Sequence, residues 1–178
     1  TLGFTTANSF IGSFNRTNLH LSAQPRVDGL AQLLNFLSEH RDESGIIYCS
    51  TRKDVDGLAE RLLAHGWSAL PYHAGLDAGT RRRNQEEWVR DNVQIMAATI
   101  AFGMGIAKSK VRLVVHYRLP QSVENYYPEI GRAGRDGLRA DCLLLYSVSD
   151  TVTQRHFIDT GAESERAGRS ARLQAMWR

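Results

Sequence analysis

Two arginines three positions apart, in the segment Gly131–Gly137 (GRAGRDG), are well suited to bind a multiply charged anion. A guanidinium group offers a planar fork of donors to phosphate oxygens, and in phosphoryl transfer such groups stabilise charge that develops on the γ-phosphate. If the segment is helical, Arg132 and Arg135 lie on one face. Gly131 and Gly134 then share another face and let a neighbouring surface approach, although two glycines inside a helix cost about 2 kcal/mol relative to alanine. A solvated, glycine-rich loop after a helix is the alternative.

The segment Ala97–Ile106 (AATIAFGMGI) is a second candidate, because it directly follows a predicted strand. Thr99 then falls at the carboxyl end of that strand, where open α/β sheets usually bind ligands. Gly103 and Gly105 would let backbone amides approach an oxyanion closely. The alternative is a tight connection between a strand and a helix, in which the threonine caps the next turn.

The segment Tyr48–Arg52 (YCSTR) ends one predicted strand and opens a predicted helix. The small hydroxyl groups of Ser50 and Thr51, together with Arg52 and the helix N-terminus, could hold a nucleic-acid phosphate. Ordinary capping of the helix by Ser50 or Thr51 explains the same residue types. Spacing alone leaves both interpretations open.

Other conspicuous side chains have simpler structural explanations. His73, in Tyr72–Leu76 (YHAGL), follows another predicted strand, but a lone loop histidine is more often packed or exposed than a ligand. Arg81–Arg83 would point in different directions on a helix, which favours a solvated helix face. We expect packed tryptophans and buried, reduced cysteines at Trp67, Trp88, Trp177, Cys49 and Cys142.

Short β-rich runs alternate with helical patterns from about Gly45 onward, which predicts an α/β fold with a parallel sheet and crossover helices. We predict strands at Gly45–Cys49, Ser68–Tyr72, Val93–Ala98, Val111–His116 and Ala140–Tyr146. We predict helices at Val27–His40, between the first strand and His65-Gly66, at Thr80–Arg90, from Ser122 and after Ser149-Asp150. The second helix carries the clearest apolar stripe, at Val55, Leu58, Ala59, Leu62 and Leu63, and glycine caps its C-terminus.

Length and composition fit one compact domain. The chain of 178 residues, 42% of them hydrophobic, is long enough to bury one sizeable core. Its formal net charge of +3 comes from 22 basic and 19 acidic residues, an excess too small to identify a polyanionic partner. No segment is apolar over a bilayer-spanning length, and the N-terminus lacks a signal pattern, so we expect a soluble, intracellular protein with no membrane partner.

The order and mutual spacing of these segments strongly resemble the second RecA-like domain of the RecQ family, within helicase superfamily 2. The likeness covers nearly the whole chain, and the combination is far more specific than any one segment. The matching segments are Ser13-Phe14-Asn15-Arg16, Ser44–Arg52 (motif IV), Tyr72–Leu76, Ala98–Ile106 (motif V) and Tyr126–Gly137 (motif VI). The resemblance implies a RecA-like, largely parallel sheet with helices on both faces.

The resemblance also implies which residues face ATP. Arg135 would be the arginine finger of an ATP-dependent DNA helicase, and Arg132 would assist at the γ-phosphate. Gly103 and Gly105 would shape the loop that links the nucleotide cleft to DNA. No Gly-x-x-x-x-Gly-Lys-Ser/Thr occurs in this sequence, so we expect ATP and Mg²⁺ to be held mainly by the first RecA-like lobe of the same protein. This piece by itself is predicted to be inactive.

On the nucleic-acid side, Thr99 and the Ser50–Arg52 turn would contact the backbone of the translocated strand, and His73 would lie near that track. Family helicases move 3′ to 5′ on single-stranded DNA. The implied function is therefore ATP-driven translocation that unwinds duplex DNA in repair and recombination. The implied location is the bacterial cytoplasm and nucleoid or the eukaryotic nucleus.

We assign residues 1–160 to the helicase lobe and residues 161–178 to a linker and the start of a helix, which in the family leads to a zinc-binding region. Several positions depart from the family pattern. Pro128 replaces the usual glutamine, a change that a helix beginning at Pro128 would tolerate, and Ile130 replaces the usual threonine. Ser109-Lys110 and Thr17 also differ from the usual residues. Pro128 and Ile130 motivate the alternative of a degenerate lobe that binds nucleic acid or protein without catalysis, whereas the intact pair of arginines argues against it. An unrelated phosphate-binding enzyme would need a general base or nucleophile, and the sequence shows no plausible triad.

Overall fold

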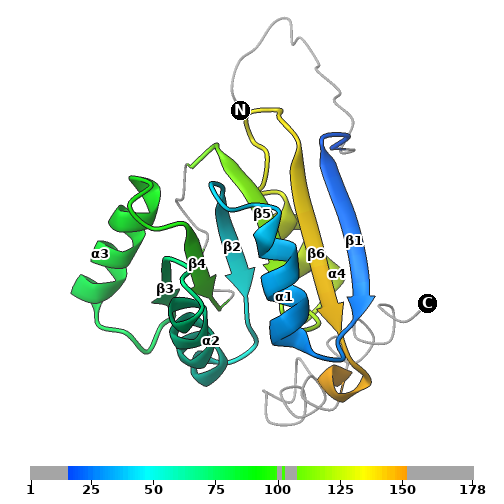
Figure 1. Cartoon of the computed structure of the whole chain (residues 1–178), viewed down its shortest axis with the longest axis horizontal. Coiled ribbons are helices and arrows are strands. Elements are labelled where there is room, and N and C mark those ends of the chain that lie inside the picture. Colours follow the sequence, from blue (N-terminus) through cyan, green and yellow to red (C-terminus); the bar gives the residue numbers. More distant parts are fainter. Residues whose placement is uncertain (1–15, 100–101, 103–107, 152–178) are drawn as a thin grey trace, which may run out of the picture.

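Six strands form one sheet in which every neighbouring pair is parallel (Figure 1). The computed structural model describes residues 16–99, 102 and 108–151. Across the sheet the strands follow the order β1 (Leu19–Pro25), β6 (Ala140–Tyr146), β5 (Val111–His116), β2 (Ser44–Tyr48), β4 (Ile95–Ala98) and β3 (Ala69–Tyr72). Because all strands run the same way, their carboxyl ends meet at one edge of the sheet, which we call the carboxyl edge.

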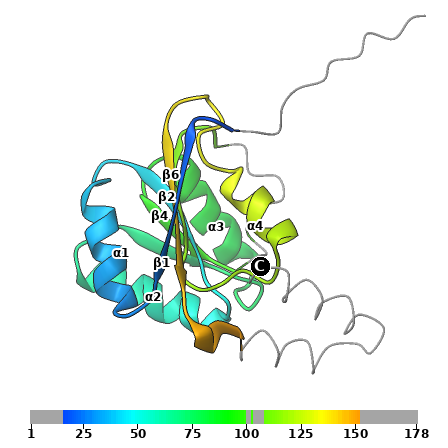
Figure 2. The same ribbon diagram turned by 90° about the vertical axis from the view of Figure 1, so that its right-hand side faces the viewer.

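Within the described residues, four helices cover the sheet (Figure 2). One face carries α1 (Gly29–Ser38) and α2 (Arg52–Ala64), and the other carries α3 (Ala78–Val89) and α4 (Val123–Ile130). This arrangement confirms the predicted α/β fold with a parallel sheet and helices on both faces.

Each face of the sheet has its own apolar core. Ile47 and Val115 point into the core beneath α1 and α2, whereas Ile46 and Val114 point into the core beneath α3 and α4. The central strand β2 is buried on both faces, which explains why its sequence is apolar without alternation. Trp88, a residue of α3, is fully buried, which confirms that this tryptophan packs in the interior.

Each helix begins at a side chain that accepts a hydrogen bond from a backbone N–H group of the first turn. These N-cap residues are Asp28, Thr51, Asp77 and Ser122. Replacing such a cap with alanine usually costs about 1 kcal/mol. At the other end of α2, Gly66 has a φ of +81°, and the N–H groups of Gly66 and Trp67 bond to the carbonyls of Leu63 and Leu62, as the predicted glycine cap requires.

The structure differs from the predicted elements in a few places. Strand β1 was not predicted, and Leu63 of the apolar stripe is 55% exposed. Residues 148–151 form a helical turn that begins slightly before the predicted start after Ser149-Asp150, and the proposed linker at residues 161–178 and Trp177 lie outside the described residues. Trp67 and both cysteines are buried, and the cysteines are free thiols, as predicted. Arg82 is solvated and paired with Glu86 at 2.8 Å, which confirms a solvated face on α3.

Candidate functional site

The turn between β2 and α2 places the predicted phosphate-binding residues at the carboxyl edge. Thr51 uses its hydroxyl group to cap α2, accepting a hydrogen bond from the N–H of Asp54 at 3.1 Å. Ser50 is half-buried, and Arg52, the first residue of α2, is exposed. The capping alternative is therefore correct for Thr51, while Arg52 and the helix N-terminus face outward, where an anion could approach.

Thr99 follows β4 at the same edge of the sheet, as predicted. Its N–H donates to the carbonyl of Tyr72 at the end of β3, at 3.2 Å, and its own carbonyl accepts from the N–H of Phe102 at 3.0 Å. Phe102 is fully buried. Gly103 and Gly105 lie outside the described residues. The backbone around Thr99 is thus anchored on both sides of the half-buried threonine.

His73 is enclosed within the protein. Its Nδ1 atom accepts a hydrogen bond from the N–H of Gly75 at 3.1 Å, so the proton of a neutral ring resides on Nε2, which lies 2.9 Å from Asp56. The side chain of His73 is only 6% exposed. The ring therefore ties the loop after β3 to helix α2, and any influence on a bound strand would be exerted through α2.

The arginine-bearing segment is a series of turns and not a helix, which corrects the helical interpretation. Helix α4 ends at Ile130, with Gly131 as its C-cap, and residues 131–136 form turns. Gly134 has a φ of +55°, and a Cβ atom there would lie 2.4 Å from the side chain of Asn18 and 2.7 Å from the carbonyl of Leu138. The glycine is needed for this conformation, and it does allow a close approach, as expected.

Pro128 also lies inside α4 and not at its first position, since the helix begins at Val123. The idea that a helix starting at Pro128 accommodates the proline is therefore wrong. Without an N–H, Pro128 cannot donate to the carbonyl of Glu124, and the helix forms with this bond missing.

Arg16 and Asn18 hold these turns in place through hydrogen bonds from their side chains to backbone carbonyls. We call the turns at residues 131–136 the arginine loop. The guanidinium group of Arg16 donates to the carbonyls of Ala133 (3.1 Å) and Gly134 (2.6 Å). Asn18 donates to the carbonyls of Gly134 (2.9 Å) and Leu138 (2.8 Å). Arg16, the last residue of the matched segment, thus supports the arginine loop, a role that no sequence pattern indicated.

The two arginines of the loop have different surroundings. Arg132 is half-buried and its charge lies near the phenol of Tyr48, whereas Arg135 is exposed and its Nε atom lies 3.5 Å from the carbonyl of Gly131. Burial raises the pKa of Tyr48, and the nearby charge of Arg132 only partly opposes that shift. The loop therefore presents one arginine outward and holds the other against the end of β2.

A buried hydrogen-bonded pair, His116 with Glu129, was not anticipated. His116, the last residue of β5, places Nε2 2.7 Å from the carboxylate of Glu129 on α4. Both side chains are less than a tenth exposed, and the imidazole stacks on Tyr48 at a centroid distance of 5.2 Å. Glu129 lies next to a segment already selected for its arginines, but only the packing of α4 on the sheet reveals its partner.

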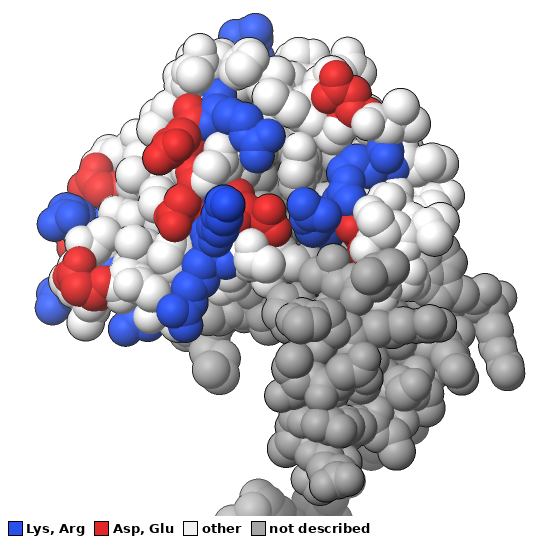
Figure 3. Space-filling model, turned by 90° about the horizontal axis from the view of Figure 1, so that it is seen from below, with Lys and Arg blue, Asp and Glu red and all other residues white. Residues whose placement is uncertain are grey.

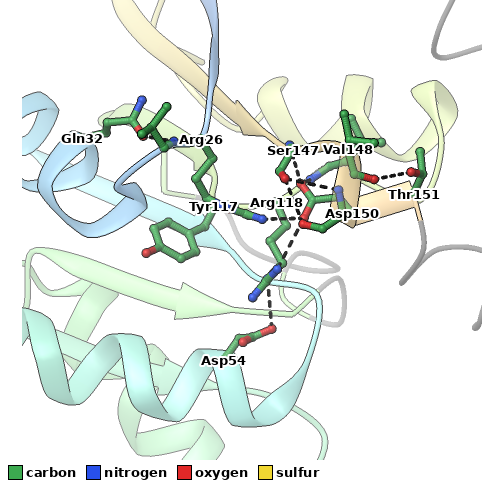
Figure 4. Close-up of polar contacts among 12 residues, drawn as sticks. Arg26, Gln32, Asp54, Tyr117, Arg118, Ser147, Val148, Asp150 and Thr151 are labelled. Carbon is green, nitrogen blue, oxygen red and sulfur yellow. Dashed lines mark hydrogen bonds and ion pairs between the residues drawn. The ribbon is translucent and has the colours of Figure 1, made fainter.

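A second polar cluster joins four segments at the carboxyl edge (Figure 4). Its centre is Asp150, whose carboxylate is 2% exposed. This carboxylate accepts from the N–H groups of Leu119 (3.2 Å) and Ser147 (2.9 Å) and pairs with Arg26 (2.7 Å) and Arg118 (3.4 Å). Arg118 also lies 3.4 Å from Asp54 on the first turn of α2. The cluster fixes the start of α2, and with it the Ser50–Arg52 turn.

Charges of both signs are interspersed over this end of the molecule (Figure 3). Among the described residues on the face that Figure 3 shows, basic groups alternate with acidic ones. In the part of the chain that the structure describes, no three His, Cys, Asp or Glu side chains come together in a way that could hold a metal ion. The same residues include no helix of the length and apolarity that crossing a membrane requires.

Comparison with known proteins identifies the class of this domain. Residues 27–137 match the family model of the helicase conserved C-terminal domain. A DEAD box protein from Methanococcus jannaschii has a similar structure, with a TM-score of 0.68 and 25% identity, over 85% of this chain and 40% of that one. The parallel sheet with helices on both faces is therefore the RecA-like fold of a helicase lobe.

Sequence relatives define the group more closely. The chain is 48% identical over 143 residues to an ATP-dependent DNA helicase RecQ from Haemophilus influenzae, over 80% of this chain and 23% of that protein. It is 44% identical over 162 residues to ATP-dependent DNA helicase Q-like 4B from Arabidopsis thaliana, over 90% of this chain and 14% of that protein. The chain thus spans less than a quarter of the length of either relative. It belongs to the helicase conserved C-terminal domain family, and within it to the RecQ family of superfamily 2.

Proposed function

We propose that this chain is the second motor lobe of an ATP-dependent DNA helicase. ATP would bind between this lobe and a first RecA-like lobe, with Arg135 as the arginine finger and Arg132 assisting at the γ-phosphate. The observation that carries the proposal is the arginine loop itself. Gly134, Arg16 and Asn18 hold the loop in one conformation, and that conformation leaves Arg135 exposed. A finger must be pre-positioned in this way to act on charge in the transition state.

The first lobe would supply the groups that this chain lacks. Its P-loop would bind the α- and β-phosphates, and its acidic residues would hold Mg²⁺. We further propose that residues 1–160 form the lobe and that residues 161–178 lead to a zinc-binding region in the complete protein.

The carboxyl edge would hold the translocated strand. Arg52 with the N-terminus of α2, and Thr99 after β4, lie at the ends of strands in one parallel sheet, and such contacts to phosphates carry no base preference. Opening and closing of the two lobes would move these groups along single-stranded DNA, in the 3′ to 5′ direction of family helicases, and unwind duplex DNA during repair and recombination. His73 would act from the interior, by positioning α2.

The test is DNA-stimulated ATP hydrolysis by the full-length protein. Arg135→Ala should lower the stimulated rate by about 10³-fold or more and leave ATP affinity within several-fold, because a finger acts chiefly on the transition state. Arg139→Ala is the matched control, since Arg139 is an exposed arginine nearby that pairs with Asp141 at 3.0 Å. The role of Arg135 is refuted if both variants hydrolyse ATP like the wild type.

A second candidate function is a degenerate lobe that binds nucleic acid or a partner protein without catalysis. The observation in its favour is Pro128, which removes a backbone hydrogen bond from α4 just before the arginine loop. Under this alternative, the full-length protein would bind DNA but show no DNA-stimulated hydrolysis. Restoring the usual residue with Pro128→Gln would then raise the rate, whereas the motor proposal expects a small effect.

A further inference from the structure

Arg118 follows β5 at the same level of the carboxyl edge as the proposed strand contacts. Strand β2 lies between β5 and β4, and Tyr48 at the end of β2 is in register with His116 of β5 and Ala98 of β4. The residues that follow these three by one or two positions are Ser50, Arg118 and Thr99. Neighbouring strands are about 4.8 Å apart, so Arg118 continues the row of proposed contacts by one strand.

The guanidinium group of Arg118 has spare hydrogen-bonding capacity. Within the described part of the chain, its contacts are a hydrogen bond to Asp150 and an ion pair with Asp54, both at 3.4 Å (Figure 4). Charge-assisted hydrogen bonds are normally about 2.7–2.9 Å long, and Arg26 makes the bond of that length to Asp150, at 2.7 Å. The Nε atom of Arg118 has no hydrogen-bond partner among the described residues. A guanidinium group has five N–H donors, so donors of Arg118 remain for a further acceptor.

The surroundings of Arg118 orient its side chain without burying it. The side chain is 30% exposed, compared with 12% for Arg26. Asp150 is 2% exposed and is held by two backbone N–H groups, so it is a fixed anchor for Arg118. Asp54 is 28% exposed, and a partly exposed ion pair contributes little to stability. A phosphate can therefore replace Asp54 as the partner of Arg118 at small cost.

Arg118 lies at the other end of β5 from Gly134 of the arginine loop. The N–H of Gly134 donates to the carbonyl of Val111, the first residue of β5, at 2.9 Å. Arg118 comes two residues after the last residue of the same strand. A phosphate bound at Arg118 is therefore expected to belong to the strand at the carboxyl edge, and not to the ATP that Arg135 is proposed to face.

We propose that Arg118 binds a backbone phosphate of the translocated strand and so extends the DNA track to the end of β5. The planar fork of the guanidinium group bonds to two phosphate oxygens together, while Asp150 keeps the fork in position. Such a contact reads no bases. This inference rests on the proposed track at the carboxyl edge, and it adds a contact outside the motifs that predicted the track.

The first experiment measures the salt dependence of single-strand binding by the full-length protein, with fluorescence anisotropy on oligonucleotides of several sequences. At low salt, Arg118→Gln should weaken binding by about ten-fold for every sequence, because it removes a hydrogen bond to a charged group. The plot of log K against log salt should become shallower by about 0.7, the value for one lost phosphate contact on a single strand. An unchanged slope would overturn the inference.

Arg139→Gln is the matched control for this experiment. Arg139 also pairs with an aspartate, Asp141 at 3.0 Å, but it precedes β6 and so lies at the amino end of the sheet. The substitution removes the same charge from the opposite edge, and its affinity and salt slope should equal those of the wild type. Equal losses in both variants would show that only net charge matters, and would overturn the inference.

Asp54→Asn distinguishes a phosphate contact from a purely structural role of Arg118. This variant keeps Arg118 and removes the negative charge that competes with a phosphate, so affinity for single-stranded DNA should stay level or rise. If Arg118 acts only by holding α2 through Asp54, then Asp54→Asn and Arg118→Gln should weaken binding alike, and this result would overturn the inference. Thermal unfolding of the full-length variants verifies that each is folded.

ATP hydrolysis separates this inference from the proposed function. Arg118→Gln should leave the KM for ATP at saturating DNA within about two-fold of the wild type, since the contact is to DNA. A raised KM with an unchanged salt slope would place Arg118 at ATP and overturn the inference. If the wild type binds single strands without DNA-stimulated hydrolysis, the motor proposal fails, but the salt slope still tests the phosphate contact. If Thr99→Ala weakens binding and Arg118→Gln does not, the track stands and only the role of Arg118 is refuted.

Discussion

We expect a methyl group added at Gly134 to lower the stability of the arginine loop more than a methyl group added elsewhere in it. A Cβ atom at this site would lie 2.4 Å from the Nδ2 atom of Asn18 and 2.7 Å from the carbonyl oxygen of Leu138. The residue also has a φ of +55°, in the left-handed region. Gly134→Ala therefore combines backbone strain with a steric clash, whereas Gly137→Ala introduces strain alone, because Gly137 has a φ of +83° and no atom within 4 Å of a Cβ there.

The two contributions can be estimated separately. A left-handed alanine costs about 1 kcal/mol, and this is the whole expected effect of Gly137→Ala. At Gly134 the displaced Asn18 also loses its hydrogen bonds to the carbonyls of Gly134 and Leu138, at about 1 kcal/mol each, which brings the expected loss to about 3 kcal/mol.

Urea unfolding of the 178-residue chain measures both losses. The midpoint should fall much further for Gly134→Ala than for Gly137→Ala, and the slope of the transition should not change. Equal destabilisation by the two substitutions would show that Asn18 and Leu138 do not restrict the site, and would refute the packing described for the loop.

Three further predictions concern DNA, acid and thiols. Thr99→Ala in the full-length protein should weaken single-strand binding at every sequence alike, as measured by fluorescence anisotropy over a range of salt; unchanged affinity and ATPase coupling would contradict the DNA track. The hydrogen bond from Arg112 holds the pKa of Asp136 below its ordinary value, so this pair stabilises the fold above the unfolded-state pKa of about 4, and the stabilisation is lost as the pH falls through the lower folded value. Unfolding curves of the wild type and Asp136→Asn should converge in acid, and a constant difference would argue against the pair. Burial raises the pKa of Cys142 to about 12 and that of Cys49 as well, so a thiol reagent near pH 8 should label the folded chain far more slowly than the unfolded chain. Equal rates would show that the thiols are accessible.

The sheet was largely predictable from the sequence because most strands are apolar runs bounded by polar turns. The predicted bounds of β5 and β6 coincide with those observed, and the bounds of β2 differ by one residue at each end. Strand β1 escaped prediction because it is an edge strand that pairs only with β6 and leaves most of its side chains exposed. Its sequence, LHLSAQP, therefore carries no burial pattern.

The site was predictable only in part, because only some of its residues directly follow strands of the sheet. Thr99 and the Ser50–Arg52 turn follow strands directly, and parallel strands bring their carboxyl ends together whatever the strand order. The contacts of Arg16 with the arginine loop and of His116 with Glu129 depend instead on how α4 packs and on the turns that follow it. The pair formed by Arg26 and Asp150 joins residues 124 positions apart, a separation that no local pattern encodes.

The central claim is that this chain contributes arginines to an ATP site that a first lobe completes. The most direct test is to measure ATP turnover by the isolated 178-residue chain, by a separately produced first lobe and by a mixture of the two. We expect a folded chain with no turnover of its own and a slight, DNA-dependent turnover in the mixture, limited by the entropy of bringing two untethered pieces together and lost with Arg135→Ala. Robust turnover by the isolated wild-type chain that disappears in its Arg135→Ala variant would refute the shared ATP site, because the chain would then contain a complete catalytic site.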